Sequence, residues 1–318
     1  MRKMRKGIKC LSLLLCAALL FCFAACGQSE KTDNEDNKIS VVCTLFPQYD
    51  FVREIAGDKA EITLLLTPGT DSHSYDPSPA DMVKINECDL FVYTGETMEA
   101  WAESIISTLS ESVEVLNVSE EIQLEKSDAN HSDHSEDSHD HSADPHIWTS
   151  PVNSMEMVRR ICAKLCEIDP ENAYFYKNNE QIYLEKLAAL DGNLRSVSDS
   201  AKNKTVVMCD RFAMLYFCEE YGLDYIAAFD SCTSNTEPSP AVIVKIVNEV
   251  KSKNIPAVFC AELSNRKVAD AVAQQTGVSV LELHSCHNLS AEDFDAGETY
   301  LTLMERNLTN LKTALGVE

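Results

Sequence analysis

Short apolar runs alternate with longer amphipathic segments along most of the chain. The short runs are rich in β-branched residues, which is typical of strands covered on both faces of a parallel sheet. We therefore expect strands at residues 39–46, 60–66, 90–93, 113–118, 205–208, 225–229, 257–261 and 278–283. The amphipathic segments predict helices at residues 47–56, from 79 onward, and at 96–109, 151–169, 171–197, 212–221, 239–254, 264–276 and 299–315. Strands that alternate with helices indicate an α/β fold with parallel sheets.

One amphipathic segment is much longer than the others. Between residues 171 and 197, six apolar residues recur at helical spacing: Tyr176, Tyr183, Leu187, Leu190, Leu194 and Val197. They form one stripe on a helix of about 27 residues, or roughly 40 Å. We predict two lobes, each a parallel sheet flanked by helices, joined by this long backbone helix.

An internal repeat links the two predicted lobes. The string DPSPADMVKI at residues 76–85 recurs as EPSPAVIVKI at residues 237–246, with seven of ten positions identical. Each copy leads from a strand through a loop into a helix that begins with Ser-Pro, a common helix start. The repeat indicates that the lobes are structurally related halves.

The N-terminus has the pattern of an export signal. A basic segment precedes an apolar run from Cys10 to Ala25, which is shorter than the ~20 residues of a membrane-spanning helix. The run ends in Phe-Ala-Ala-Cys26-Gly, which resembles the lipobox of bacterial lipoproteins, where the thiol is lipidated; the alternative is a plain signal peptide with an incidental cysteine. The expected organisation is a lipoprotein signal peptide at residues 1–25, a tether at 26–38, an N-terminal lobe at 39–168, a connecting helix at 169–199 and a C-terminal lobe at 200–318.

Charge and histidine content narrow the chemistry. The formal net charge of −24 argues against nucleic acid as a partner. Five of the eight histidines lie between residues 130 and 148, and four of these alternate with acidic and serine residues: His131, His134, His139 and His141. We interpret residues 128–143 as a mobile loop that collects metal ions, the alternative being an acidic linker.

Three histidines outside this alternating run occupy positions where a ligand site is expected. His73 lies on a loop after the second strand, His146 lies in the string Asp-Pro-His-Ile-Trp beside the His-rich run, and His284 directly follows the last strand. Ligands of parallel α/β domains gather beyond the carboxyl ends of the strands. Three imidazoles there suit Zn²⁺, which prefers nitrogen and sulfur ligands.

The combined motifs resemble those of a known family, the zinc- and manganese-binding lipoproteins that serve as substrate receptors of bacterial ABC importers (the TroA-like solute-binding family). The matching strings are LLTPGTDSHSYDP at residues 65–77, the His-rich insertion, DPHIW at 144–148 and YGL at 221–223. The resemblance spans residues 39–315. It implies a receptor outside the cytoplasm, anchored by lipid at Cys26, that binds metal in an interlobe cleft and delivers it to a membrane permease and its ATPase.

In the second lobe the sequence departs from the family pattern. His73 and His146 match the first two histidine ligands of the family, but Cys209-Asp210-Arg211-Phe212 stands where the family has His-Asp-Ala-Phe. We expect His284 to replace the missing histidine. Four further residues are candidates to complete the metal site: Cys209, Asp210, Glu262 and His287. A disulfide between Cys232 and Cys286 and two free thiols are equally compatible with the sequence.

Two other functions compete with the receptor hypothesis. A zinc-dependent extracellular hydrolase would use an open coordination position to activate water, but no His-Glu-x-x-His pair is present. A surface adhesin would use the same lipid anchor without explaining the three histidines. We therefore expect a receptor that is not an enzyme, with Zn(II) favoured over Mn(II), because Mn(II) prefers more oxygen ligands.

Overall fold

The computed structural model describes residues 38–70, 75–125, 143–229 and 238–317. The predicted signal peptide, nearly all of the predicted tether, His73, the His-rich loop up to residue 142 and Cys232 lie outside the described residues. Residues Ile39–Glu318 form one compact unit. No helix among the described ranges has the length and apolar character needed to span a bilayer.

The first sheet has four parallel strands in the order β2-β1-β3-β4. Its strands are β1 (Ile39–Cys43), β2 (Ala60–Leu64), β3 (Leu90–Tyr93) and β4 (Glu114–Asn117). The helices α2 (Phe46–Ala56), α3 (Pro79–Glu87) and α4 (Ala100–Ile106) connect them. Gly57 ends α2 with a φ of 53°, a backbone conformation that glycine adopts at low cost.

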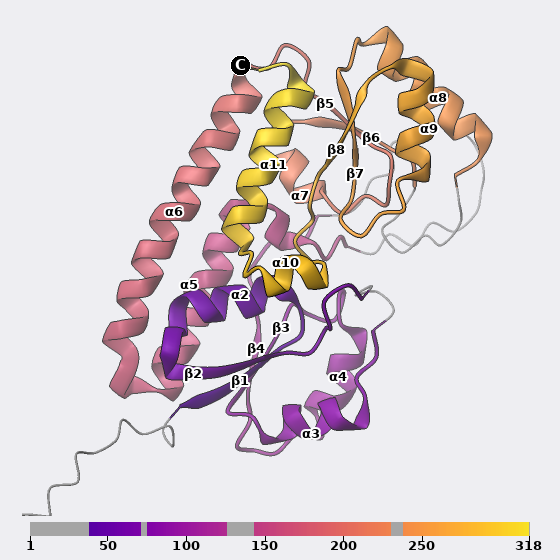
Figure 1. Cartoon of the computed structure of the whole chain (residues 1–318). Coiled ribbons are helices and arrows are strands. Elements are labelled where there is room, and N and C mark those ends of the chain that lie inside the picture. Colours follow the sequence, from indigo (N-terminus) through magenta and orange to yellow (C-terminus); the bar gives the residue numbers. More distant parts are fainter. Residues whose placement is uncertain (1–37, 71–74, 126–142, 230–237, 318) are drawn as a thin grey trace, which may run out of the picture. The chain divides into compact units, whose positions relative to one another are not determined.

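The second sheet repeats this topology in the order β6-β5-β7-β8, again with parallel strands. It contains β5 (Thr205–Met208), β6 (Asp224–Ala227), β7 (Ala257–Cys260) and β8 (Ser279–Glu282). The helices around it are α7 (Leu215–Glu220), α8 (Pro240–Ser252), α9 (Lys267–Thr276) and α11 (Tyr300–Leu315), while the short helix α10 (Ala291–Asp295) lies beside α2. The two sheets, each flanked by helices, confirm the predicted fold class (Figure 1).

Alternate side chains of each strand enter different cores. Val41 and Cys43 of β1 belong to a large apolar cluster with α2, α5 (Pro151–Ile168) and α6 (Ala173–Ser200), whereas Val42 faces a smaller cluster beside α3 and α4. In β5, Val206 joins the large cluster and Val207 joins the cluster under α8 and α9. This period of two follows from strand geometry and explains the apolar runs in the sequence. The large cluster continues through both lobes.

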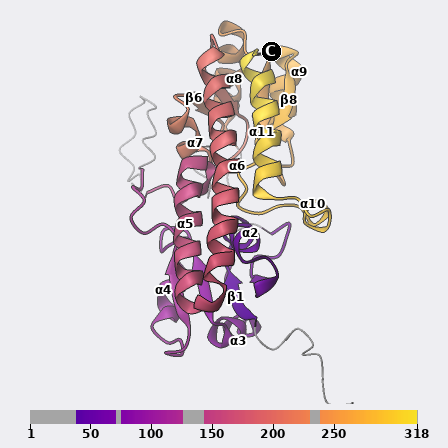
Figure 2. The same cartoon turned by 90° about the vertical axis from the view of Figure 1, so that its left-hand side faces the viewer.

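Helix α6 is the long connecting element that the sequence predicts. All six residues of the predicted stripe are buried, and the helix packs against α2, α5 and α11 (Figure 2). At 1.5 Å per residue its 28 residues span about 42 Å. Because α2 and α5 belong to the first lobe and α11 to the second, α6 joins both lobes through one packed surface. The exact lobe boundaries at residues 168 and 200 stay predictions.

Three helices begin three or four residues later than the sequence predicts, among them α9, which begins at Lys267 rather than at residue 264. Helix α4 begins at Ala100 rather than at residue 96, because the preceding segment wraps around the buried Glu99 carboxylate, which accepts hydrogen bonds from the backbone N–H groups of Thr94 and Gly95. Helix α7 begins at Leu215 rather than at residue 212, where Phe212 instead stacks on Tyr225 with ring centroids 4.0 Å apart. The short helix α10 was not predicted.

Candidate metal centre

His146 lies at the end of the segment that follows the His-rich loop. Its side chain is fully buried, and its Nδ1 is 2.9 Å from Oδ1 of Asp144, which also accepts the His146 backbone N–H at 2.8 Å. A carboxylate beside Nδ1 keeps the proton on that nitrogen, so Nε2 carries the ring's lone pair. Pairing of a carboxylate with the remote nitrogen is the usual arrangement for a histidine that binds zinc.

His287 has the same arrangement in the second lobe. Its Nδ1 lies 3.2 Å from Oε1 of Glu262 and also contacts the Ser285 hydroxyl, which donates to Glu262. Nδ1 is therefore surrounded by acceptors and holds the proton, which again leaves the lone pair on Nε2. The His287 side chain is 18% exposed, whereas those of His146 and His284 are 0% and 1% exposed.

The two carboxylate-paired histidines approach each other across the lobe junction. The rings of His146 and His287 have centroids 6.3 Å apart and are inclined by 62°. Two imidazoles on one tetrahedral zinc ion would have centroids about 5 Å apart, given zinc–nitrogen distances of ~2.0–2.1 Å. An approach of about 1 Å would therefore place both rings on a common ion.

Backbone and side-chain contacts hold the two lobes together at this point. The Trp148 indole N–H donates to the Ser285 carbonyl at 2.7 Å, and the Phe46 backbone N–H donates to the His287 carbonyl at 3.4 Å. Tyr216 donates its hydroxyl to the Asp144 carbonyl at 2.7 Å. These bonds fix the segments that carry His146 and His287 relative to each other.

His284 faces a different environment from the one its position in the sequence suggested. Its Nδ1 accepts a hydrogen bond of 2.9 Å from the backbone N–H of Cys286, which has a left-handed φ of 61°. An imidazole nitrogen that accepts carries no proton, so the neutral ring has its proton on Nε2. Nε2 is buried and has no hydrogen-bond partner in the part of the chain that the structure describes. Asn307 additionally holds the backbone of His284 through two bonds of 2.7 Å.

Glu262 links the residues of this segment. It accepts the Ser285 backbone N–H at 2.9 Å and lies 3.9 Å from Nδ1 of His284. Burial alone would raise the pKa of Glu262, but the positive charge that His284 and His287 carry when they are protonated, together with the hydrogen bonds from Ser285, outweighs it and holds the pKa below its ordinary value. Glu262 is therefore a buried carboxylate that stays ionised and orients imidazoles.

The structure does not bring Cys209 and Asp210 together with these histidines. Cys209 belongs to the apolar cluster under α8 and α9, and burial, followed by Cys260 and Asp210, raises its pKa to about 12. Asp210 accepts hydrogen bonds from the Arg211 backbone and from the Ser264 hydroxyl. A neutral thiol under α8 and α9 is a poor metal ligand, because the thiolate is the binding form.

The loop that leads to His73 is held against the His287 segment. Asn288 donates its side-chain amide to the carbonyls of Thr67 and Thr70 at 3.0 and 2.7 Å, and the Gly69 backbone N–H donates to the Leu289 carbonyl at 2.8 Å. Within the described ranges, no group of three or more His, Cys, Asp or Glu residues is arranged to hold a metal ion. His73 lies outside these ranges, as does Cys232, while Cys286 is buried.

Sequence reasoning missed three residues that shape this site: Asp144, Ser285 and Asn288. Asp144 stands two residues before His146, and a carboxylate near a candidate histidine ligand is a usable signal for its orienting partner. Ser285 acts through Glu262 and His287 within the second lobe, and Asn288 acts through Thr67 and Thr70 of the first lobe; the sequence carries no local signal for either set of contacts.

The sequence profile described as "Zinc-uptake complex component A periplasmic", ZnuA, matches residues 41–314. The chain belongs to the ZnuA family. It is 34% identical over 320 residues to the high-affinity zinc uptake system protein ZnuA of Bacillus subtilis strain 168, covering 96% of this chain and 98% of the relative. It is 33% identical over 310 residues to the zinc-binding lipoprotein AdcA of Streptococcus pneumoniae serotype 4, but spans only 61% of that relative's length.

Solved structures of ZnuA-like proteins share the fold. The Zn(II)-bound ZnuA-like domain of Streptococcus pneumoniae AdcA has a TM-score of 0.75 at 31% identity, with 87% of this chain and 99% of that domain covered. This likeness confirms the family resemblance and the two-lobe architecture expected from the sequence.

Proposed function

We propose that this ZnuA-family chain is an extracytoplasmic receptor that binds Zn(II) between its lobes and delivers it to the permease and ATPase of an ABC importer. One observation carries the proposal: His146 and His287 face each other across the lobe junction, each with Nδ1 against a buried carboxylate. In both rings the lone pair is therefore on Nε2, the nitrogen that can bind the metal ion. Nitrogen ligands favour Zn(II) over Mn(II). The zinc ion is cargo, and we assign no reaction to the site.

The ligand set that these contacts favour is His73, His146 and His287. The sequence favoured His284 as the third histidine, but its Nδ1 accepts the Cys286 N–H, and the proton on Nε2 would have to leave before the ring could bind metal. His287 needs no such change. Glu262 then acts as the orienting carboxylate of His287, as Asp144 does for His146.

His73 is within reach of this pair by chain length. It follows Thr70 by three residues, so its Cα lies no more than about 11 Å from that of Thr70 at ~3.8 Å per residue. Thr70 is itself bonded through its carbonyl to Asn288, the residue next to His287. This tether supports His73 as the ligand from the first lobe.

Two further elements extend the proposal to the whole chain. Lipid attachment at Cys26 would hold the receptor at the outer face of the membrane, with residues 26–38 as the tether. The His-rich loop at 128–143 would collect zinc weakly and raise its local concentration near the site, because its residues are polar and rich in ligands. The adhesin alternative accounts for neither paired imidazole.

Zinc competition against a chromophoric chelator tests the proposal on metal-free protein. We expect one tight site that X-ray absorption assigns to three nitrogen ligands, and we expect His146→Ala to weaken it by roughly 100-fold. Cells that lack the chain should lose zinc uptake at low zinc and recover it with the wild-type chain. A tight preference for Mn(II), or unimpaired uptake without the chain, would contradict the proposal.

A further inference from the structure

The two ends of the His-rich loop meet at one point of the first lobe. The Asp144 backbone N–H donates to the Glu125 carbonyl at 2.9 Å, so the chain leaves this lobe and returns to it at two bonded residues. We call Glu125 and Asp144 the neck of the loop. The 18 residues between them carry four of the eight histidines. Whatever holds the neck therefore determines how this segment is attached to the body of the protein.

Tyr216 of the second lobe holds the neck with a single hydroxyl group. The hydroxyl accepts the Glu125 backbone N–H at 3.0 Å and donates to the Asp144 carbonyl at 2.7 Å. The Tyr216 side chain is 5% exposed, and burial raises the pKa of Tyr216, so the hydroxyl keeps the proton that it donates. Each end of the loop is thus bonded to α7 as well as to the other end.

The neck also carries the support of a proposed zinc ligand. The Asp144 carboxylate accepts the backbone N–H of His146 and lies against Nδ1 of its ring. Helix α7 packs on the segment Ile147–Thr149 that follows, and the Ser150 hydroxyl donates to the Glu220 carboxylate at 3.3 Å (Figure 2). Displacement of Asp144 from α7 would therefore move the group that fixes the His146 ring.

We propose that Tyr216 is a positioning residue for zinc binding, which fastens the neck of the His-rich loop to the second lobe and so keeps the Asp144–His146 pair in place. The inference rests on the proposed function of the cleft as a zinc site. Tyr216 acts through the neck and is not itself a zinc ligand. Without its hydroxyl the neck loses both of these bonds to the second lobe, and zinc binding must then order the neck at a cost in affinity.

The length of the loop determines how much this hydroxyl contributes. Holding the ends of a flexible segment together becomes less favourable with length, roughly as the 3/2 power of the number of residues. For the mobility that the sequence predicts, a segment of 18 residues is about tenfold harder to hold than a segment of four. Tyr216 should therefore matter in the full chain and much less in a chain whose loop is short.

Tyr216→Phe tests this role, because it removes the hydroxyl and keeps the ring that packs in the large apolar cluster. We expect zinc affinity to fall by about tenfold, mostly through faster dissociation in stopped-flow mixing with a chelator. X-ray absorption should count the same nitrogen ligands as in wild type, because no ligand is removed.

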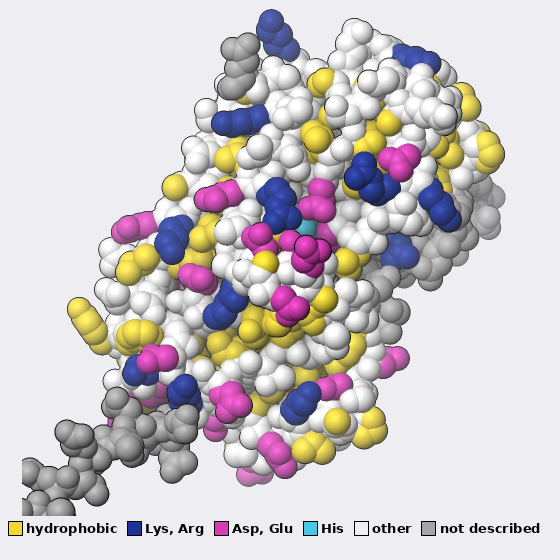
Figure 3. Space-filling view, in the orientation of Figure 1, with side chains coloured by type: hydrophobic (Ala, Val, Ile, Leu, Met, Phe, Trp, Pro, Cys, Tyr) yellow, Lys and Arg dark blue, Asp and Glu magenta, His cyan; other side chains and the backbone are white. Residues whose placement is uncertain are grey.

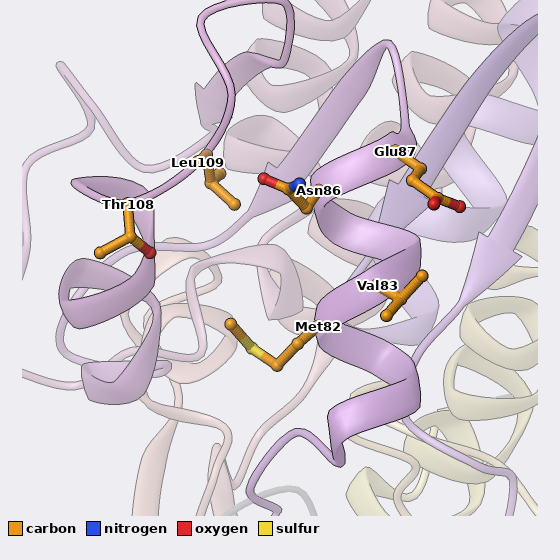
Figure 4. A pocket seen from close by; sticks show the side chains of 6 residues that line it. All are labelled: Met82, Val83, Asn86, Glu87, Thr108 and Leu109. Atoms are coloured by element: carbon orange, nitrogen blue, oxygen red, sulfur yellow. The ribbon is translucent and has the colours of Figure 1, made fainter.

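Two variants that lose a hydroxyl elsewhere are the controls. Tyr221→Phe removes a bond of 3.1 Å to Asp191 directly after α7. Thr108→Val removes a bond of 2.7 Å to the Ile105 carbonyl in the first lobe, beside a hollow of about 360 Å³ that α3 borders (Figure 4). Both should keep the zinc affinity and dissociation rate of wild type, whatever stability they lose.

Shortening the loop separates the neck from a general effect on the fold. Deletion of residues 129–142 leaves four residues between Glu125 and Asp144, a usual length for a tight connection. In this shortened chain Tyr216→Phe should change zinc affinity by less than about threefold. The deletion also removes four acidic residues, but many carboxylates remain on the surface that Figure 3 shows, and this loss is common to both shortened chains. The difference between the two Tyr216→Phe effects therefore isolates the neck.

The outcomes distinguish this inference from the proposed function. If wild-type protein has no tight zinc site, the receptor function fails and the inference fails with it. If wild type binds zinc tightly and Tyr216→Phe changes neither affinity nor dissociation, Tyr216 is not a positioning residue. An equal loss of affinity in the full and the shortened chain would show that the hydroxyl acts on the fold rather than through the neck.

Discussion

Oε1 of Glu262 lies 3.2 Å from Nδ1 of His287, whereas Nδ1 of the neighbouring His284 faces the backbone N–H of Cys286. Two histidines separated by three positions thus have opposite proton arrangements. His287 presents an unprotonated Nε2, and His284 presents a protonated one. This difference determines which of them can bind a metal ion without losing a proton.

Replacing each of these two histidines separately gives the most direct test of the ligand set. We expect His287→Ala to weaken zinc binding by roughly 100-fold, because a nitrogen ligand is lost. His284→Gln should change the affinity by less than about threefold, since the Gln carbonyl can accept the Cys286 N–H that Nδ1 accepts now. Competition titration of the metal-free proteins measures both. Loss of the tight site in His284→Gln with full retention in His287→Ala would reverse the assignment.

The carboxylate behind His287 should matter nearly as much as a ligand. Glu262→Gln replaces an ionised acceptor with a neutral amide, so the His287 ring is held less firmly and is less basic. We expect zinc affinity to fall by about 10- to 100-fold. Glu282→Gln, at a half-exposed carboxylate on β8 that pairs with Arg306, is the control and should leave affinity unchanged. Equal affinities for the two variants would remove Glu262 from the site.

Asn288 should control how firmly the His73 loop is held. Asn288→Ala removes two hydrogen bonds to the carbonyls of Thr67 and Thr70, so the loop that leads to His73 is held less firmly. We expect about a tenfold loss of zinc affinity, mostly as faster zinc dissociation in stopped-flow chelator experiments. Asn310→Ala removes a comparable bond to the Glu282 carbonyl and serves as the control. A slower association with unchanged dissociation would contradict this role.

The sequence predicted the architecture well where periodicity dominates. The stripe on α6 is visible because its buried residues recur at helical spacing over many turns, and β3 and β5 match the predicted ranges because all of their residues are apolar or β-branched. Helix α10 escaped prediction because its five residues, AEDFD, carry no periodic pattern. Short elements of this kind form through capping and tertiary contacts.

The choice between His284 and His287 was beyond the sequence for a specific physical reason. Strand alternation ends after β8, and the direction of each later side chain depends on backbone turns. Cys286 adopts a left-handed φ of 61°, which is uncommon for residues other than glycine and is indicated by no sequence pattern. Cys209 follows β5 at the position where the family has a histidine. Its side chain enters the apolar cluster under α8 and α9, which no pattern in the sequence indicates.

The buried Glu99 should make the stability of the metal-free protein depend on pH. Burial raises its pKa to about 7, and hydrogen bonds from Thr44 and the backbone of Thr94 and Gly95 oppose this only in part. A carboxyl whose folded pKa is raised stabilises the fold below its unfolded pKa of ~4.3, and this contribution is lost as pH rises through about 7. The loss amounts to roughly 4 kcal/mol at most.

Glu99→Gln should remove this pH dependence, because a neutral amide does not titrate. Urea unfolding from pH 5 to 8 should therefore show the variant gaining stability relative to wild type as pH rises. Glu111→Gln, at an exposed position before β4, should follow the wild-type curve. A constant difference between Glu99→Gln and wild type at every pH would show that Glu99 is already ionised at pH 5.

The large apolar cluster that runs through both sheets and α6 also determines how the molecule comes apart. If either lobe unfolded, apolar residues of the other lobe that are buried in this cluster would become exposed to water. The lobes should consequently lose their structure in one cooperative transition, with equal calorimetric and van't Hoff enthalpies for the metal-free protein. A fragment that ends before α6 would retain all four strands of the first sheet. It would lack the apolar face of α6 that covers its core, so we expect that it does not fold alone.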